Sequence, residues 1–318
     1  MIYRTKIDNV LIVGAGLIGT SWAAFFLAKG FNVIVSDPGP DVEGKVRAGI
    51  EEFWPDLEKL GLSTEARKEK LSFVNDLGQA LQSADLVLEQ GPEREDFKRK
   101  LFRQIDDILA TDVLVVSSSS SIPMSIIAAD CTHSPERCLI AHPFNPPHII
   151  PLVELVGSPQ TSPDAIDAAD SLFTKLGKVC VRLNKEVPGH AANRIAAALF
   201  REVVSLVDQD VLSVEDVDKA LTWGPGLRWG VMGQILLYHL GGGTGGITHY
   251  FDQFAGPMQY IWSLLETPEL NADLRTKIGE GIARYVGDRP MHELEAERDA
   301  VLISLIEARK KVGGIVAP

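Results

Sequence analysis

The stretch from Asn9 to Asp37, NVLIVGAGLIGTSWAAFFLAKGFNVIVSD, constrains the fold of this chain more than any other. A short apolar run leads into glycines in G-x-G-x-x-G spacing, then into a helical stretch and a second apolar run that ends in an acid. Because these pieces occur in this order, they predict a parallel βαβ unit that binds a dinucleotide at the turn after its first strand.

The glycines of this turn each have a physical task. Gly14 permits the tight turn, Gly16 lets the backbone approach a pyrophosphate, and Gly19 lets the helix pack against the strand. Leu17 and Ile18 complete the start of the helix, where unpaired N–H groups and the positive end of the helix dipole face the phosphates. We therefore expect these five residues to contact the cofactor.

Asp37 ends the second apolar run, eighteen residues after Gly19. A carboxylate in this position accepts hydrogen bonds from the hydroxyls of the adenosine ribose and repels a 2′-phosphate. The pattern therefore favours NAD over NADP. A flavin dinucleotide can use the same fingerprint, but the 318 residues show no second dinucleotide signature.

The remaining sequence alternates between apolar runs and helical stretches, and then becomes helical throughout. Further apolar runs lie at residues 84–90, 112–121, 137–146 and 178–183. Their alternation with helical spacing predicts an α/β fold with a Rossmann-type, doubly wound and mainly parallel sheet. Beyond EVPG (186–189) apolar residues recur every three to four positions, which predicts an all-helical C-terminal domain. We expect an NAD-binding domain over 1–187 and a helical substrate and dimerisation domain over 188–318.

Polar side chains follow several of the apparent strands. They include Asp37, the serines at 117–121 and His142. Because ligands of open α/β sheets bind beyond the carboxyl ends of the strands, these side chains should gather at one edge, beside the cofactor. Serines are also common in turns and helix caps, so the strand-end position is what singles out this run.

The stretch HPFNPPHIIPLVE (142–154) contains a stiff turn between two apolar segments. Its prolines fix the backbone and remove N–H donors, which favours the presentation of one side chain, His142. A lone histidine after a strand is often a hydrogen-bonded core residue. Glu154 favours a second interpretation, that His142 is a general base, because a carboxylate at imidazole Nδ1 fixes the tautomer and leaves Nε2 to accept a proton. We expect His148 to lie at the rim of the site.

These motifs resemble the 3-hydroxyacyl-CoA dehydrogenase family. The resemblance rests on the glycine fingerprint, the serine run, HPFNP, Glu154 and KEVPGHAANRI (185–195), and it covers essentially the whole chain. It implies that His142 is the general base, paired with Glu154. It also implies that Ser120 and Asn193 contact the substrate oxygen, with Ser119 or Ser121 as alternatives to Ser120.

The resemblance extends to the cofactor and to the substrate. It implies cofactor contacts for Glu93 and Lys98 in PEREDFK, which can also be read as an exposed helix start. The implied reaction is the NAD-dependent oxidation of the 3-hydroxyl of a small L-3-hydroxy acid. Asn145 is expected either to tie its turn together or to touch the substrate.

Three segments, 53–62, 223–233 and 239–257, resemble the carnitine dehydrogenases within this family. Carnitine carries a trimethylammonium group, which aromatic faces bind well, and a carboxylate, which an arginine can pair with. The candidate substrate residues in the second domain are Trp223, Arg228, Trp229, Tyr238 and Phe251. For each aromatic residue the alternative is a role in core or dimer packing, and for Arg228 it is a structural ion pair. The stretch 142–157 resembles gulonate dehydrogenases as well, so a gulonate or an acyl-CoA substrate stays open.

Composition bears on partners and on location. The net charge of −12 argues against nucleic acid, because binding phosphates requires a basic face. The three cysteines lack metal-binding spacing, so we expect reduced thiols and no metal. No apolar run reaches the length of a membrane helix, so we expect no membrane segment and a cytoplasmic protein. Both the helical faces and the resemblance imply a homodimer. A rival from another class is a non-catalytic NAD-binding structural protein, like the relatives recruited to the lens.

Overall fold

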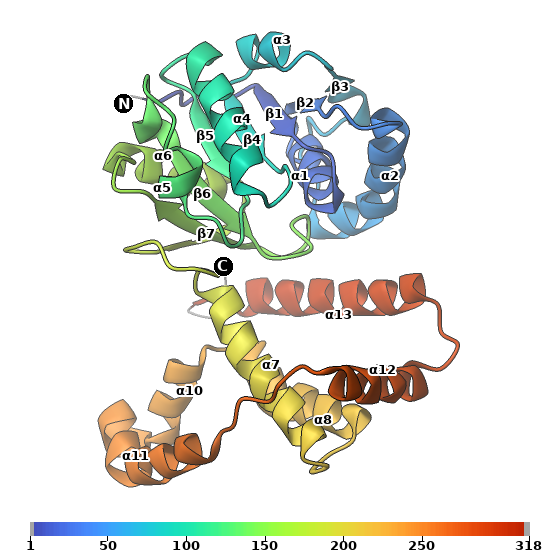
Figure 1. The fold of residues 1–318 in the computed structure, drawn as a ribbon, viewed down its shortest axis with the longest axis vertical. Helices are drawn as coiled ribbons and strands as arrows, with labels where there is room; N and C mark the ends of the chain where they lie inside the picture. The colour runs from blue at the N-terminus through green and yellow to red at the C-terminus, as the bar shows by residue number, and fades with distance from the viewer. Residues whose placement is uncertain (1–2, 315–318) are drawn as a thin grey trace. The chain divides into compact units, whose positions relative to one another are not determined.

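The computed structural model describes residues 3–314. The chain divides into two compact units, the first ending at Asn193 and the second beginning at Arg194. The first unit contains the sheet, and the second consists of helices (Figure 1).

The first unit is built on one sheet with the strand order β3-β2-β1-β4-β5-β6-β7-β8. All neighbouring strands are parallel except β6 and β7, which run antiparallel. The predicted Rossmann-type sheet, followed by helices, is therefore confirmed. The strands are β1 (Asn9–Val13), β2 (Asn32–Ser36), β3 (Leu71–Phe73), β4 (Leu86–Glu89), β5 (Leu114–Ser117), β6 (Cys138–Pro143), β7 (Leu152–Gly157) and β8 (Val179–Arg182).

Helices cover both faces of this sheet and bury an apolar core on each (Figure 1). One core packs Trp22, Phe26 and Phe173 against the sheet, and the other packs Phe102 and Ile105 against its opposite face. Burial on both faces explains why the central strands are continuous apolar runs rather than alternating ones. The helices are α1 (Leu17–Ala28), α2 (Val42–Leu60), α3 (Leu77–Gln82), α4 (Glu95–Ile108), α5 (Met124–Ile127) and α6 (Pro163–Lys175).

The order of the strands determines where a ligand can bind. Strands β2 and β3 lie on one side of β1, and β4 to β8 lie on the other. The order in which the chain adds strands to the sheet therefore reverses between β1 and β4, although these two strands are parallel. In open α/β sheets the crevice at such a reversal, beyond the carboxyl ends of the strands, is where ligands bind. The glycine turn after β1 and the serine run after β5 both lie at this edge.

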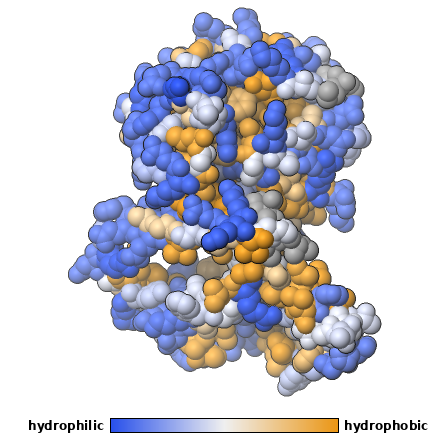
Figure 2. Space-filling model, turned by 180° about the vertical axis from the view of Figure 1, so that it is seen from behind, coloured by the Kyte–Doolittle hydropathy of each residue, from blue (hydrophilic) through white to orange (hydrophobic). Residues whose placement is uncertain are grey.

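The second unit buries little of its own apolar surface. Within its helices the buried residues are few, and large apolar side chains such as Trp223 and Ile235 are more than three quarters exposed. Figure 2 shows apolar side chains at the surface of these helices. The helices are α7 (Ala192–Asp208), α8 (Val214–Leu221), α9 (Leu227–Trp229), α10 (Gln234–Gly241), α11 (Gly246–Leu264), α12 (Ala272–Val286) and α13 (Met291–Val312).

A π-helical turn over Thr222–Gly226 joins α8 to α9, and the glycine-rich run joins α10 to α11. The sequence leaves open whether this glycine run is mobile or close to another group, and the structure shows a close approach. A Cβ on Gly242 would lie 1.8 Å from the carbonyl oxygen of Gly246. Among the helices formed by residues 3–314, none combines the length and the apolar character needed to cross a membrane.

Candidate active site

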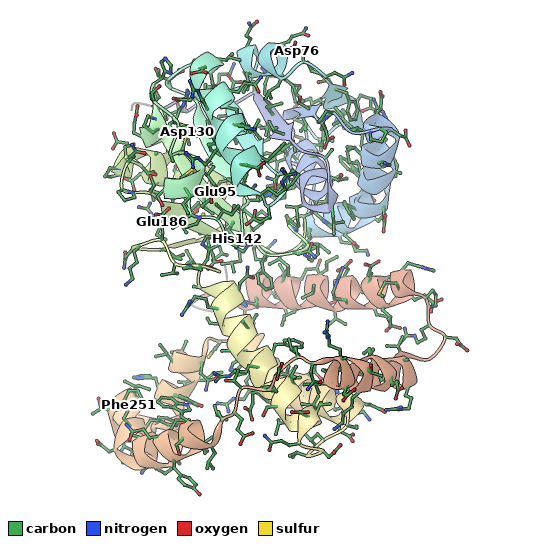
Figure 3. The ribbon with its side chains drawn as sticks, in the orientation of Figure 1. Asp76, Glu95, Asp130, His142, Glu186 and Phe251 are labelled. Carbon is green, nitrogen blue, oxygen red and sulfur yellow. The ribbon has the colours of Figure 1, made fainter. Side chains whose placement is uncertain are left out.

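His142 and Glu154 face each other across the antiparallel strands β6 and β7. They form a directly opposed pair in the register of these strands, and Nδ1 of His142 lies 3.0 Å from Oε2 of Glu154. Both residues are buried, with 4% and 1% of their surfaces exposed. Figure 3 labels His142 at the edge of the sheet-containing unit. The short turn and the antiparallel return of the chain therefore place an acid twelve residues away beside the imidazole.

The carboxylate of Glu154 is stabilised in its charged form. Burial raises the pKa of Glu154, but the hydrogen bond from His142 and those from the backbone N–H groups of Ala192 and Ala191 more than offset it, so the net shift is downward. The two backbone N–H groups donate to Oε1, each at 2.9 Å. An ionised carboxylate can only accept, so Nδ1 of His142 carries the proton of this bond and Nε2 points the other way.

Nε2 of His142 is 3.1 Å from the hydroxyl oxygen of Ser120. Ser120 is the exposed member of this contact, whereas His142 is buried. Ser119 and Ser121, the alternatives in the sequence, direct their hydroxyls to the carboxylate of Glu93 instead, both at 2.8 Å. Of the three serines, Ser120 is therefore the one that shares a site with the imidazole.

Glu93 anchors the serine loop that carries Ser120. Its Oε1 also accepts hydrogen bonds from the backbone N–H groups of Ser120 and Ser121, at 3.0 and 2.8 Å. Burial raises the pKa of Glu93, but the bonds from Ser119 and Ser121 and the charge of Lys98 outweigh this effect and hold the pKa below its ordinary value. An anionic Glu93 thus holds the loop in place.

Lys98 lies inside the fold beneath this loop, with 1% of its surface exposed. Its ammonium group donates to both carboxylate oxygens of the buried Glu89, at 2.7 and 2.8 Å, and lies 3.6 Å from Glu93. Ser117 donates to the same Glu89 at 2.6 Å. A buried ion pair of this kind requires several hydrogen bonds to compensate the lost hydration of its charges. The structure places Lys98 in this network rather than at the surface where a ligand would bind.

The three glycines of the β1–α1 turn differ in what surrounds them. Gly14 has a φ of +98°, and a Cβ there would lie 2.8 Å from the backbone of Gln90. A Cβ on Gly19 would lie 2.1 Å from the carbonyl oxygen of Gly14. A Cβ on Gly16 would meet none of the described atoms within 4 Å. Two glycines are therefore required by the fold, and Gly16 borders open space, as the close approach of a pyrophosphate to the backbone would require.

Asp37 follows β2 directly and lies next to this turn. Its Oδ2 accepts the N–H of Ala15 at 2.7 Å, and its Oδ1 accepts the N–H of Gly39 at the same distance. Each carboxylate oxygen has a further lone pair for a ribose hydroxyl. Leu17 is exposed and Ile18 half-buried at the start of α1, where Gly16 is the N-cap. The residues of this turn thus fit a dinucleotide.

The loop between β6 and β7 is fixed from two sides. His148 was expected at the rim, but the structure corrects this expectation, because His148 is buried. Its ring stacks on Phe53 at 4.3 Å, and its backbone N–H donates to the hydroxyl of Ser21 in α1 at 2.9 Å. Asn145, by contrast, is exposed in this loop. The loop that follows the catalytic candidate is thereby tied to the helix that follows the glycine turn.

Lys178 fixes the loop from the other side. The side chain is buried, and its ammonium group donates to the carbonyl oxygens of Pro147 and Ile150. It also lies 4.1 Å from the ring centroid of Phe25 and 4.9 Å from that of Trp22. Burial, with a smaller contribution from the charge of Lys29, lowers the pKa of Lys178 to about 7.

This burial predicts a pH-dependent stability. Between pH 7 and the ordinary lysine value of 10.5, the unfolded chain binds a proton at Lys178 that the folded chain lacks. The free energy of unfolding should therefore rise with pH in this window, by at most about 1.4 kcal/mol per pH unit, and this contribution should be constant below it. Urea unfolding of the wild type and of Lys178→Met across this range measures the effect. Parallel curves for the two proteins would contradict it.

The candidate substrate residues of the second unit lie in and around α9, α10 and α11. Tyr238 stacks on Tyr250 with ring centroids 4.3 Å apart, and Tyr250 contacts Phe251 at 6.2 Å. Figure 3 labels Phe251 on α11, where it is more than half exposed. Trp229 donates from its indole to Gln234, and Trp223 and Arg228 are exposed. Asn193, in the first turn of α7, is half-buried and belongs to the first unit.

Glu89, Lys178 and His190 are buried around the candidate site, and none of them is predicted as a site residue from the sequence. Glu89 ends an apolar strand and His190 follows a Pro-Gly turn, which are the positions where a signal could have been sought. Among residues 3–314, no group of three or more His, Cys, Asp or Glu side chains is arranged to hold a metal ion.

Comparison with known proteins identifies the family. The model for the 3-hydroxyacyl-CoA dehydrogenase NAD binding domain matches residues 9–187, and the model for the C-terminal domain of the same family matches residues 189–285. The chain belongs to the 3-hydroxyacyl-CoA dehydrogenase family. The family resemblance noted in the sequence is thus confirmed, together with NAD as the cofactor and with dehydrogenation of a secondary hydroxyl as the class of reaction.

Relatives within the 3-hydroxyacyl-CoA dehydrogenase family include L-carnitine dehydrogenases. Those of Bacillus cereus and of a Pseudomonas species are 38% and 40% identical to this chain. Each alignment covers 97% of this chain, and 94% and 96% of the relative, respectively.

Two solved structures are also similar. An NAD-dependent dismutase, 5-formyl-3-hydroxy-2-methylpyridine 4-carboxylic acid 5-dehydrogenase, superposes with a TM-score of 0.81 at 29% identity, over 94% of this chain and 97% of its own. The (S)-3-hydroxybutyryl-CoA dehydrogenase of Ralstonia eutropha gives a TM-score of 0.62 at 29% identity, over 70% and 78%.

Proposed function

We propose that this protein oxidises the 3-hydroxyl group of a small L-3-hydroxy acid with NAD, and that L-carnitine is its substrate. The observation that carries the reaction is the line Glu154–His142–Ser120, in which a charged carboxylate holds an imidazole whose free nitrogen faces an exposed hydroxyl. The full-length similarity to L-carnitine dehydrogenases supports the choice of substrate.

In the proposed mechanism the protein orients the alcohol and accepts its proton. Ser120 and Asn193 hold the substrate oxygen, and Nε2 of His142 takes the proton of the hydroxyl group. Glu154 stabilises the imidazolium that forms, through the bond already present at Nδ1. The bound nicotinamide supplies the hydride acceptor. A positioned base of this kind contributes about 10²–10⁴-fold in rate.

We assign the cofactor to the turn after β1 and to its surroundings. The backbone at Gly14, Gly16 and Gly19, with Leu17 and Ile18, binds the pyrophosphate, and Asp37 binds the ribose. Glu93 borders the cofactor from the serine loop, where it is exposed. Lys98 acts through Glu93 and Glu89, because its ammonium group is buried against both carboxylates.

Replacement of Gly16 with valine tests the cofactor site without disturbing the fold. A Cβ at this position meets no described atom within 4 Å, so the variant should fold with an unchanged Tm and lose NADH binding. The same replacement at Gly19 is the contrasting variant, because its Cβ would clash with the carbonyl of Gly14 and lower the Tm. Fluorescence titration with NADH and thermal unfolding measure both effects. Undiminished NADH binding by Gly16→Val would contradict the assignment.

The substrate residues are proposed on chemical grounds. Trp223, Trp229, Tyr238 and Phe251 provide aromatic faces for a quaternary ammonium group. The guanidinium of Arg228 provides a partner for the carboxylate, and the exposed Asn145 is a further polar contact near His142. A coenzyme A thioester and L-gulonate are the alternatives within the same reaction, the first supported by the similarity to 3-hydroxybutyryl-CoA dehydrogenase.

We further propose that the protein is a cytoplasmic homodimer that does not bind nucleic acid. Large apolar side chains of the helical unit that are not assigned to the substrate are exposed in the single chain, including Ile235, Ile261 and Trp262. Exposed apolar area on this scale indicates a partner surface. The net charge of −12 opposes contact with phosphate backbones. We place the division between the NAD-binding and the helical domains at residues 187 and 188, where the two family models meet, although the two compact units divide a few residues later, after Asn193.

This function is tested by a panel of substrates whose oxidation is monitored through the near-ultraviolet absorbance of NADH. The panel contains L-carnitine, D-carnitine, L-gulonate, 3-hydroxybutyrate and 3-hydroxybutyryl-CoA, each with NAD and with NADP. We expect the highest kcat/KM for L-carnitine with NAD. A preference for the CoA ester or for gulonate would overturn the substrate. NADH binding without turnover of any 3-hydroxy acid would favour the non-catalytic, lens-protein type of role.

A further inference from the structure

A single turn between β8 and α7, Gly189–Ala192, contacts both partners of His142. On one side, the backbone N–H groups of Ala191 and Ala192 donate to Oε1 of Glu154, the carboxylate whose Oε2 holds the imidazole. On the other side, the ring of His190 reaches the serine loop. The turn therefore connects the acid behind the base to the hydroxyl in front of it.

The contact of His190 with the serine loop is specific. Its Nε2 lies 2.9 Å from the carbonyl oxygen of Ser119, the residue immediately before Ser120. A carbonyl oxygen only accepts, so Nε2 carries the proton. The other ring nitrogen, Nδ1, is buried and has no hydrogen-bond partner among residues 3–314. The ring is 3% exposed, so this single bond to the loop forms away from competing water.

His190 also contacts the candidate base directly. The ring centroids of His142 and His190 are 4.8 Å apart, with the planes inclined by 47°. The backbone of His190 has a φ of +49°, in the left-handed region that few residues other than glycine adopt, although asparagine, aspartate and histidine adopt it more often than the others. This conformation has a cost, and here it directs the ring inward between His142 and the serine loop.

We propose that His190 is a positioning residue that fixes the hydroxyl of Ser120 against Nε2 of His142. The inference rests on the proposed function, because it concerns how the base and its hydroxyl partner are held together. His190 acts through Ser119 and His142, and it is assigned no contact with the substrate. It restrains the Ser119 carbonyl through a hydrogen bond and restrains the His142 ring by contact, so that the separation of 3.1 Å between Ser120 and His142 is kept.

A matched pair of amide variants separates positioning from folding. In His190→Gln the side-chain amide has the reach of Nε2 and can donate to the Ser119 carbonyl. In His190→Asn the amide is one methylene shorter and cannot, although asparagine suits the left-handed backbone better than glutamine does. A merely structural role therefore favours Asn, whereas positioning favours Gln.

Steady-state kinetics, NADH binding and thermal unfolding are measured for the wild type, both variants and His142→Gln. We expect His190→Asn to lose about 10–100-fold in kcat, the scale of a small misplacement of a reacting group, with a much smaller change in the Kd for NADH. His190→Gln should keep most of kcat despite an equal or lower Tm. Equal kcat values for Gln and Asn, or kcat values that follow Tm, would overturn the proposal.

Failure of the proposed function is recognised separately, because it leaves the wild type without turnover. A crystal structure of His190→Asn then decides on positioning alone. We expect the hydroxyl of Ser120 to move away from Nε2 of His142, and an unchanged separation of 3.1 Å would overturn the inference.

Discussion

Replacement of His142 with glutamine is expected to lower kcat by about 10²–10⁴-fold and to leave the Kd for NADH unchanged. The proposed base is the only group whose free nitrogen faces Ser120 in the described site, and glutamine cannot accept a proton near neutral pH. His142 does not contact the glycine turn in any described hydrogen bond, so the cofactor should still bind. NADH formation and the fluorescence of bound NADH measure the two quantities.

The same substitution at a surface position is the control. His133 lies beside Asp106 and Asp107, and its side chain is 61% exposed. His133→Gln should leave kcat and NADH binding as in the wild type. Retained kcat in His142→Gln would contradict the proposed base. Loss of NADH binding together with a lowered Tm would show that the residue is structural instead.

Replacement of Glu154 with glutamine is expected to lower kcat by about 10²-fold or more, because the imidazolium loses its counter-charge and the imidazole loses its fixed tautomer. A side chain of the same shape keeps the packing of this buried position. If Glu154 acts only through His142, the double variant His142→Gln/Glu154→Gln should be no slower than the slower single variant. Multiplied effects of the two substitutions would contradict a shared role.

The same carboxylate predicts a pH dependence of stability. The pKa of Glu154 is below its ordinary value in the folded protein. The ionised group therefore stabilises the fold above the unfolded-state value, and this contribution is lost as the pH falls through the folded-state value. Unfolding free energies of the wild type and of Glu154→Gln should differ at neutral pH and converge in acid. A difference that is constant with pH would contradict the charged state assigned here.

Local sequence patterns predicted the sheet and one edge of the site. The spacing of Gly14, Gly16 and Gly19 is a backbone requirement, and the structure shows two of these requirements as close contacts with the neighbouring backbone. The strands β1, β2, β4, β5, β6 and β8 each lie within predicted apolar runs. Because parallel strands align their carboxyl ends, the serine run and His142 could be placed together before any coordinates were known.

The other features of the fold and of the candidate site depend on contacts between residues that are far apart in the sequence. The pattern of serines alone could not distinguish Ser119 from Ser120 or Ser121; the hydrogen bonds from Ser119 and Ser121 to Glu93 make that distinction. Strand β7 lies in the apolar segment after the proline-rich loop, but the sequence did not predict it as a strand. Its antiparallel pairing with β6 could not be predicted either, because an apolar run does not indicate the direction of its neighbour. His148 was expected at the rim, since nothing near it in sequence indicates its burial against Phe53.

The role proposed for His190 also depends on a contact that is distant in sequence. It donates to the carbonyl oxygen of Ser119 across 71 positions of sequence, from a turn with a left-handed backbone that the sequence does not indicate. The sequence likewise predicts Lys178 only as the polar start of a strand. In the structure its ammonium group is buried against two carbonyl oxygens of a distant loop.

A crystal structure of the protein with NADH and the 3-oxo product would show whether His142 and Ser120 hold the oxygen that reacts. We expect the 3-oxygen of the product to lie within hydrogen-bonding distance, about 3 Å, of both Nε2 of His142 and the hydroxyl of Ser120. We also expect C4 of the nicotinamide to lie about 3–3.5 Å from the carbon that bears this oxygen. A nicotinamide ring bound away from His142, or a 3-oxygen held by other groups, would contradict the proposed mechanism.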